Sequence, residues 1–254
     1  MSDSSSSKRR LLISCRVFQR EIADCLARTG CRADVRYLPM GIHGDTANKA
    51  RAAIQAAVDS ADPQVHDVVL IGYGVCNCGV RGLVAGPLPL VLPRAYDCIS
   101  LLLGSRQRYR DFFQDEPNTY FKTSGWVDAG EDASVTPLGA VASRLGIDHD
   151  LQSLVARYGE DNGRYVYETL QRRPYAQHVY VTTGCPDEHE LIDRCRQQAQ
   201  QVGCPLQVVH GTTRLLDALL QGPWDDNDFL VTPPGKQVEV VFDDRLLRWK
   251  VPSS

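Results

Sequence analysis

The sequence predicts an α/β fold in which a mostly parallel sheet carries helices on both faces. Short apolar runs alternate along the chain with segments of helical periodicity, as in βαβ units. The runs are apolar throughout, as expected for strands covered on both sides. The chain has 254 residues, of which 43% are hydrophobic, so it can bury a sizeable core. A single domain is therefore expected over residues 11–254, after a polar, disordered tail at 1–10.

The first half of the chain shows the alternation clearly. Gly30 is expected to end the first helix, and Asp45 or Thr46 can cap the second. The expected strands are 11–14, 35–38, 68–71 and 88–92, and the expected helices are 17–29 and 47–60.

The same rhythm returns near the carboxyl terminus. The expected strands there are 178–182, 206–209, 229–232 and 237–242, and the expected helices are 188–202 and 212–220. The repetition suggests two similar βαβ lobes, 11–104 and 172–254, joined by an aromatic and helical insert at 105–171. Residues 105–132 hold six aromatic side chains and few strand or helix signals. They are expected either to form an ordered excursion over a pocket or to pack locally around a connecting helix.

The net charge and the hydropathy of the sequence limit the classes of partner that are expected. A formal net charge of -3 provides no general attraction to nucleic acid or to acidic lipid surfaces. No apolar stretch approaches the roughly 18 residues of a membrane span, and the run before Cys15 is too short for an export signal. We therefore expect a cytoplasmic protein without membrane or nucleic-acid partners. In that compartment its nine cysteines are thiols or metal ligands rather than disulfides.

The segment LIGYGVCNCGVRG, residues 70–82, poses the main functional question. Gly72 and Gly74 match the start of a dinucleotide-binding G-x-G-x-x-G motif, but Asn77 replaces the third glycine. No Gly-Lys-Ser/Thr follows, so a P-loop is excluded as well. A tight turn and a thiol site remain as interpretations.

The distribution of cysteines favours the thiol site. Four of them fall just past predicted strand ends, where parallel α/β sheets bind their ligands. These are Cys15, Cys76, Cys98 and Cys185. Converging thiolates suit Zn²⁺ more than an iron–sulfur cluster in the absence of a C-x-x-C pair. The alternatives are small buried residues in βα turns, or Cys76 as a catalytic nucleophile. The role of Cys78 stays open, and His43 is the most plausible histidine ligand.

A second group of polar residues lies in LPRAYDC, residues 92–98. Arg94 can bind a carboxylate or phosphate through its planar guanidinium, and Asp97 can orient the substrate or act as a base. Both residues also have a structural interpretation. Arg94 and Asp97 can form an ion pair at the strand end, and Asp97 can cap the helix that starts near Cys98.

Four blocks in this order resemble the DUF1638 family of bacterial and archaeal proteins: LIGYGVCNCGVRGL, LVLPRAYDCISLLLGSRQRY, NTYFKTSGW and ARYGEDNGRYVYETL. The resemblance extends from residue 11 to about 241. The positions that match the family pattern are Cys76, Arg94, Asp97, Cys98, Tyr120, Gly125 and Trp126. Tyr96 departs from it, because many members have histidine there, and a carried-over metal site would then lack or replace that ligand.

The resemblance implies an association with corrinoid-dependent methyltransfer genes. We expect a thiolate-rich, metal-dependent, methyltransferase-like enzyme acting on a small anionic molecule, with a corrinoid supplied through a partner protein. Asp97 and Tyr120 are the catalytic candidates. The substrate-binding candidates are Arg94, Trp126 and Gly74, and the metal candidates are Cys76, Cys98, Cys15 and Cys185. The alternative is a noncatalytic carrier or chaperone for a metal or a corrinoid.

Overall fold

The computed structural model describes residues 9–40, 47–76, 79–115, 119–129, 151–171, 177–201 and 203–252. It confirms the α/β class. Residues 1–8 of the predicted tail, His43 and Cys78 lie outside the described residues, whereas Arg9 and Arg10 already belong to the first strand.

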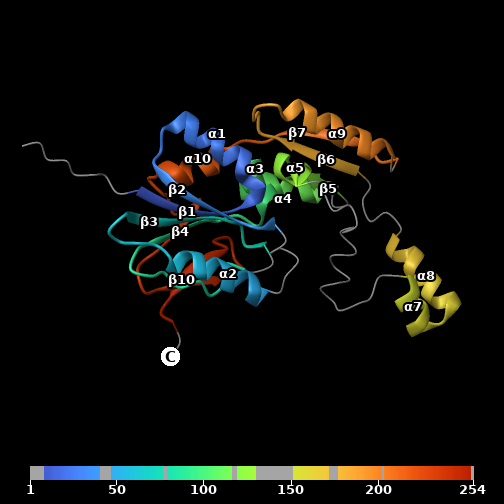
Figure 1. The fold of residues 1–254 in the computed structure, drawn as a ribbon, viewed down its shortest axis with the longest axis horizontal. Coiled ribbons are helices and arrows are strands. Elements are labelled where there is room, and N and C mark those ends of the chain that lie inside the picture. Colours follow the sequence, from blue (N-terminus) through green and yellow to red (C-terminus); the bar gives the residue numbers. More distant parts are fainter. Residues whose placement is uncertain are drawn as a thin grey trace, which may run out of the picture.

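A five-stranded sheet forms the centre of the fold (Figure 1). Its order is β2 (Ala33–Leu38), β1 (Arg9–Cys15), β3 (His66–Gly72), β4 (Leu90–Pro93) and β8 (Phe229–Thr232). The first four strands are parallel, and β8 runs antiparallel at the edge. The carboxyl ends of β1, β3 and β4 therefore meet at one edge of the sheet.

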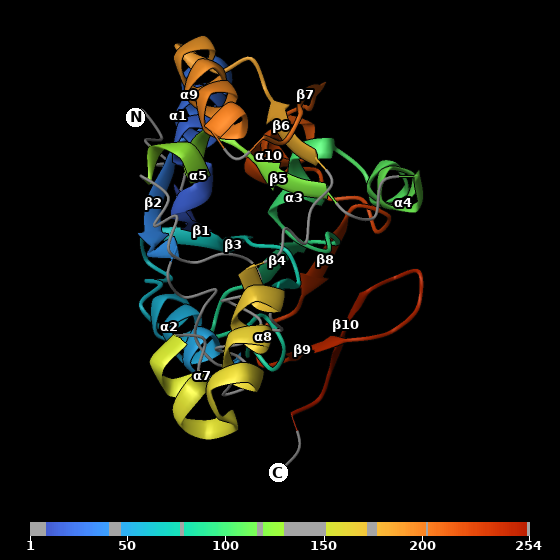
Figure 2. The same cartoon turned by 90° about the vertical axis from the view of Figure 1, so that its right-hand side faces the viewer.

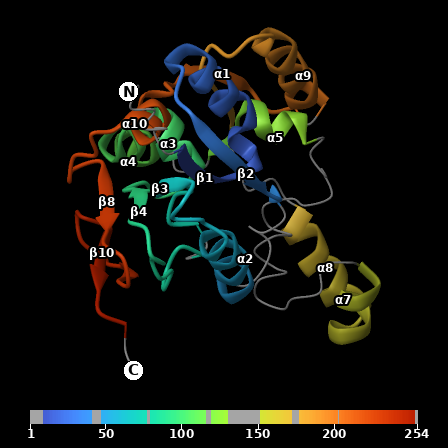
Figure 3. The same ribbon diagram turned by 60° about the vertical axis from the view of Figure 1, so that its left-hand side comes forward.

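Helices cover both faces of this sheet. A short 3-10 turn, η1 (Arg16–Phe18), leads into α1 (Gln19–Thr29), which packs beside α10 (Arg214–Gln221) on one face. Helix α2 (Ala47–Asp59) lies on the other face (Figure 3). The apolar strands β1 and β3 are consequently buried from both sides, as their sequences predict.

A second, three-stranded parallel sheet lies beside the first. It consists of β5 (Thr119–Lys122), β6 (Gln177–Thr182) and β7 (Leu206–His210), with α9 (Glu188–Gln201) packed on it. The short helix α5 (Ser124–Asp128) contacts α9, α1 and η1, so it connects the two sheets.

The structure divides the chain differently from the two lobes suggested by the sequence. Strand β8, from the second half, pairs with β4 in the first sheet, and β5, from the predicted insert, pairs with β6 in the second. Sheet membership depends on long-range pairing, which the local pattern does not reveal. Residues 105–132 also hold α4 (Arg106–Asp115), β5 and α5, so this segment contains a connecting helix, as the second interpretation of it expects.

Two hairpins complete the described chain. Strands β9 (Gln237–Val240) and β10 (Leu247–Lys250) form an antiparallel ribbon next to β8 (Figure 2). Helices α7 (Leu151–Tyr158) and α8 (Glu160–Gln171) pack on each other, which confirms a helical segment there. In the described parts of the chain, no helix has the length and hydropathy of a membrane span.

Candidate thiol site

Three of the four predicted thiols come together at the carboxyl edge of the five-stranded sheet. Cys15 ends β1, Cys76 follows β3, and Cys98 opens α3 (Cys98–Leu103) just after β4. They are close enough to act on one another electrostatically: Cys15 affects the pKa of Cys76, and both affect that of Cys98. The parallel sheet thus gathers thiols that are far apart in sequence.

Close backbone packing brings Cys76 to Cys98. A Cβ added to Gly74 would lie 2.6 Å from both the Cα and the backbone nitrogen of Asp97, so only glycine allows this approach. Next to it, the Cys76 amide donates to the Tyr96 carbonyl at 3.0 Å. The backbone N–H groups of Cys98 and Gly74 act to lower the pKa of the Cys76 thiol. Gly74, predicted to bind substrate, therefore serves the packing of this segment.

Burial favours the protonated form of these three thiols. Desolvation raises the pKa of Cys76 to about 12 and that of Cys15 to about 11, and it raises the pKa of Cys98 well above its ordinary value. The backbone donors at Cys76 act in the opposite direction but are outweighed. A sulfur nucleophile at this site therefore needs a bound cation or a base to ionise it.

Asp97 caps α3, as its structural interpretation predicts. Its Oδ1 accepts from the Ser100 amide at 2.8 Å, and its own amide donates to the Ser100 hydroxyl at 3.0 Å, which completes a capping box. The Tyr109 hydroxyl donates to Oδ2 at 2.7 Å. Desolvation raises the pKa of the Asp97 carboxyl despite these donors. Tyr109 was not predicted as a site residue, although it lies in the aromatic segment that the sequence singled out.

The two aromatic site candidates occupy different places. Trp126 packs against the buried cluster that contains Cys98, and it acts to lower the pKa of that thiol. Tyr120 lies on β5, with its ring centroid 5.3 Å from that of His178 and 5.6 Å from the Lys122 ammonium. The structure thus places Trp126 near Cys98 and Tyr120 in the second sheet.

Arg94 has a structural environment. Its buried Nε donates to the carbonyls of Asp226 and Phe229 at 2.8 and 3.1 Å, and its Nη2 pairs with the Asp226 carboxylate at 2.7 Å. Nη1 donates to the carbonyls of Arg245, at 2.8 Å, and Leu247. The guanidinium thus ties the end of β4 to the loop before β8 and to the β9–β10 ribbon. These contacts favour the structural interpretation over an anion-binding role, with Asp226 as the partner instead of Asp97.

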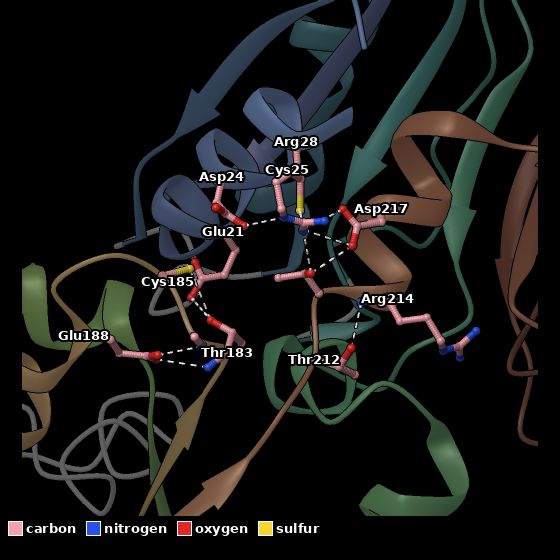
Figure 4. A network of polar contacts seen from close by, with 12 residues as sticks. Glu21, Asp24, Cys25, Arg28, Thr183, Cys185, Glu188, Thr212, Arg214 and Asp217 are labelled. Atoms are coloured by element: carbon pink, nitrogen blue, oxygen red, sulfur yellow. Dashed lines mark hydrogen bonds and ion pairs between the residues drawn. The ribbon is translucent and has the colours of Figure 1, made fainter. Parts of the chain in front are cut away.

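Cys185 follows a strand of the second sheet, whereas the other three thiols lie at the edge of the first, so its place in a four-cysteine set stays a prediction. It follows β6 in the second sheet, and its sulfur lies 3.3 Å from the Thr183 hydroxyl. The carboxyls that act on its pKa include those of Glu21 and Glu188 (Figure 4). The shared strand-end position was predicted correctly, but β1 and β6 belong to different sheets.

Glu21 is a buried carboxyl that the sequence analysis did not identify. Its Oε1 accepts from the Ser124 hydroxyl at 2.6 Å, whereas its Oε2 has no hydrogen-bond partner among the described residues. Position 21 lies on the same face of α1 as the buried Cys25, and it follows buried Val17 of η1 by four residues. A charged residue within that apolar stripe was therefore a detectable signal.

A metal bound by Cys15, Cys76, Cys98 and Cys185 stays a prediction. Among the described residues, no group of three or more His, Cys, Asp or Glu side chains is arranged to hold a metal ion. The three thiols nevertheless supply soft donors of the type that Zn²⁺ binds.

Fold and site together define an α/β protein with a group of buried thiols at the carboxyl edge of a parallel sheet. The chain belongs to the DUF1638 family: the family model described as "Protein of unknown function (DUF1638)" matches residues 37–220. The match covers Cys76, Cys98 and Trp126, whereas Cys15 and Glu21 precede it, so it is narrower than the resemblance inferred from the sequence. No curated protein and no solved structure matches the chain.

Glu21 leads to a prediction about pH. Desolvation, together with Glu188, raises its pKa above the ordinary value of 4.5. The unfolded chain therefore releases the proton at lower pH than the folded protein, and stability should fall as pH rises between the two pKa values. Relative to Glu21→Gln, wild type should lose about 1.4 kcal/mol of unfolding free energy per pH unit within this window.

Urea unfolding between pH 4 and pH 8 measures this difference. The informative quantity is its slope with pH, because the amide also adds a constant offset. Glu160→Gln, a change on an exposed side chain, should leave the slope unchanged. Parallel curves for wild type and Glu21→Gln would show that the carboxyl ionises normally in the folded protein.

Proposed function

We propose that the chain is a metal-dependent enzyme whose reactive centre is the thiol pair Cys76 and Cys98, acting in methyl or one-carbon transfer. The convergence of these thiols with Cys15 at the sheet edge is the observation that carries the proposal. Parallel α/β sheets bind their ligands at this edge. Zn²⁺ is the preferred metal, ahead of an iron–sulfur cluster.

The effect of burial on the thiols favours a site that binds a cation. Each thiol is neutral because burial disfavours the thiolate, and its neighbours Asp97 and Cys15 add to that effect at Cys76. A bound Zn²⁺ would replace one proton on each ligating sulfur and compensate the buried negative charge. A metal held by these sulfurs would keep an acceptor thiol ionised at neutral pH, as methyl transfer to sulfur requires.

Arg94 is not part of the proposed substrate site, because its guanidinium already donates to backbone carbonyls and to the Asp226 carboxylate. The aromatic ring of Tyr109 and the indole of Trp126 supply apolar surface beside the sulfurs. A small methyl donor or acceptor, delivered by a corrinoid-carrying partner, fits such a surface. The second candidate function is a noncatalytic metal or corrinoid carrier, in which the thiols would only store the ligand.

Zinc titration of protein purified without oxygen tests the proposal. In weak buffer, wild type should bind one equivalent of Zn²⁺ and release about two protons, one for each of Cys76 and Cys98. Cys76→Ser and Cys98→Ser should each lose stoichiometric metal. Cys195→Ser, which alters a buried thiol on α9, should behave as wild type. Equal metal binding by all four proteins would refute the site.

A small thiol distinguishes the enzyme from the carrier. If the metal keeps an open coordination position, mercaptoethanol added to the zinc-loaded protein should bind and release about one further proton. A closed carrier site should give no such release. The Cys195→Ser protein again provides the matched reference.

A further inference from the structure

Three consecutive residues of α5 connect the two sheets at the thiol site, each by a different contact. The Ser124 hydroxyl donates to buried Glu21 at 2.6 Å. The backbone of Gly125 lies so close to η1 that an added Cβ would be 1.9 Å from the Val17 carbonyl oxygen. The Trp126 side chain packs against the buried cluster that contains Cys98. The place of the indole thus depends on how α5 is seated.

Glu21 is a carboxyl residue at a buried position where an apolar side chain would suffice for packing alone. It is fully buried on α1, and a carboxyl there costs free energy that an apolar side chain of similar size would not. Its Oε1 receives Ser124 at 2.6 Å and the Thr183 hydroxyl at 3.4 Å. It therefore meets one hydroxyl from α5 and one from the loop after β6, the two segments of the second sheet that face α1.

The polar surroundings of Glu21 come from several elements. Cys185 and Glu188 follow β6, Tyr180 lies on β6, and Tyr37 lies on β2; each interacts electrostatically with the Glu21 carboxyl. Glu188 has other partners of its own, because it accepts from the amides of Thr183 and Gly184 at 3.1 and 2.8 Å. Among these contacts, the short bond to Ser124 is the one that leads directly to Trp126.

We propose that Glu21 is a positioning residue for the thiol site: by holding Ser124 it seats α5, and α5 places the Trp126 indole beside Cys98. Glu21 does not touch the thiol pair itself. The inference deepens the proposed function, since it names what keeps Cys98 covered and oriented. It nevertheless concerns the metal-free protein, so it can fail or hold independently of zinc binding.

Alkylation of native protein by iodoacetamide tests the proposal. Cys98 is almost fully buried, so its rate of modification reports the opening of α5. Glu21→Val and Ser124→Ala should each raise the Cys98 rate about tenfold, the effect of losing one buried hydrogen bond. Glu21→Gln, which keeps an acceptor oxygen for Ser124, should restore a rate within about twofold of wild type.

The chain contains its own control. Cys25 lies on α1 one turn after Glu21, where Arg28 contacts its sulfur and α10 packs against the helix, so it stays covered unless α1 itself comes loose. Trypsin separates the two thiols, with Cys98 in peptide 95–106 and Cys25 in peptide 21–28. Mass spectrometry can therefore follow both rates in one sample.

The possible results are distinct. A rise at Cys98 with Cys25 unchanged, reversed by Glu21→Gln, supports the positioning role. Equal rises at Cys98 and Cys25 would mean that Glu21 only stabilises the fold, and unchanged rates in Glu21→Val and Ser124→Ala would mean that α5 is seated without it. Either outcome overturns the inference while leaving the zinc titration unaffected.

Discussion

Replacing Arg94 with lysine is expected to lower the free energy of unfolding by about 3 kcal/mol and to leave zinc binding at the thiols unchanged. The guanidinium is buried and donates to the carbonyls of Asp226, Phe229 and Arg245, while pairing with the Asp226 carboxylate. A lysine ammonium has fewer donors and cannot reproduce the planar arrangement. Several buried carbonyls would then lose their partners.

Thermal unfolding with and without carboxylate or phosphate ligands checks this expectation. Arg245→Lys is the matched control, because Arg245 pairs with the same Asp226 carboxylate at 3.0 Å but is exposed. That change should alter the unfolding free energy by less than about 0.5 kcal/mol. If Arg94→Lys melts like wild type but loses a ligand-induced shift that wild type shows, Arg94 binds an anion after all.

Replacing Gly125 with alanine is expected to cost at least about 3 kcal/mol of unfolding free energy, because the new Cβ would lie 1.9 Å from the Val17 carbonyl oxygen. Both sides of the contact are backbone, so no side-chain rotation can relieve it. Helix α5 would have to move away from η1 and take Trp126 away from Cys98. Reduced stability should therefore accompany faster alkylation of Cys98.

Gly86→Ala provides the control for this change. Apart from its chain neighbours, no atom of the described residues lies within 4 Å of a Cβ built on Gly86, so alanine there should be tolerated within about 0.5 kcal/mol. Urea unfolding of the two variants beside wild type gives the comparison. A Gly125→Ala protein as stable as Gly86→Ala would show that α5 and η1 are not in backbone contact.

Periodicity was sufficient to predict most of the first sheet. Residues 11–14 and 68–71 were predicted as strands and lie within β1 and β3, and the helix at 47–60 corresponds to α2. These segments are local in their signal, because an apolar run or a helical stripe is complete within one element. Strand β5 was missed, since four residues in an aromatic-rich region carry little pattern.

The candidate site shows the same division. The positions of Cys15 and Cys76 at or just after strand ends followed from the βα alternation, and the cap formed by Asp97 followed from its place before a helix. The partner of Arg94 could not be predicted, because Asp226 is 132 positions away and is brought close only when β8 pairs with β4. Glu21 was visible as a charge on an apolar helix face, but its partner Ser124 was not.

The α/β class, the strand ends that carry the thiols and the family of the chain could all be predicted from the amino-acid sequence. These depend on residue types within single elements. Three features became evident only in the tertiary structure. Cys98 lies near Cys15 and Cys76, Cys185 of the second sheet lies near Glu21 of α1, and Arg94 pairs with Asp226 of the same chain. Such contacts depend on which strands become neighbours, and pairing between distant segments is set by the packing of the whole chain.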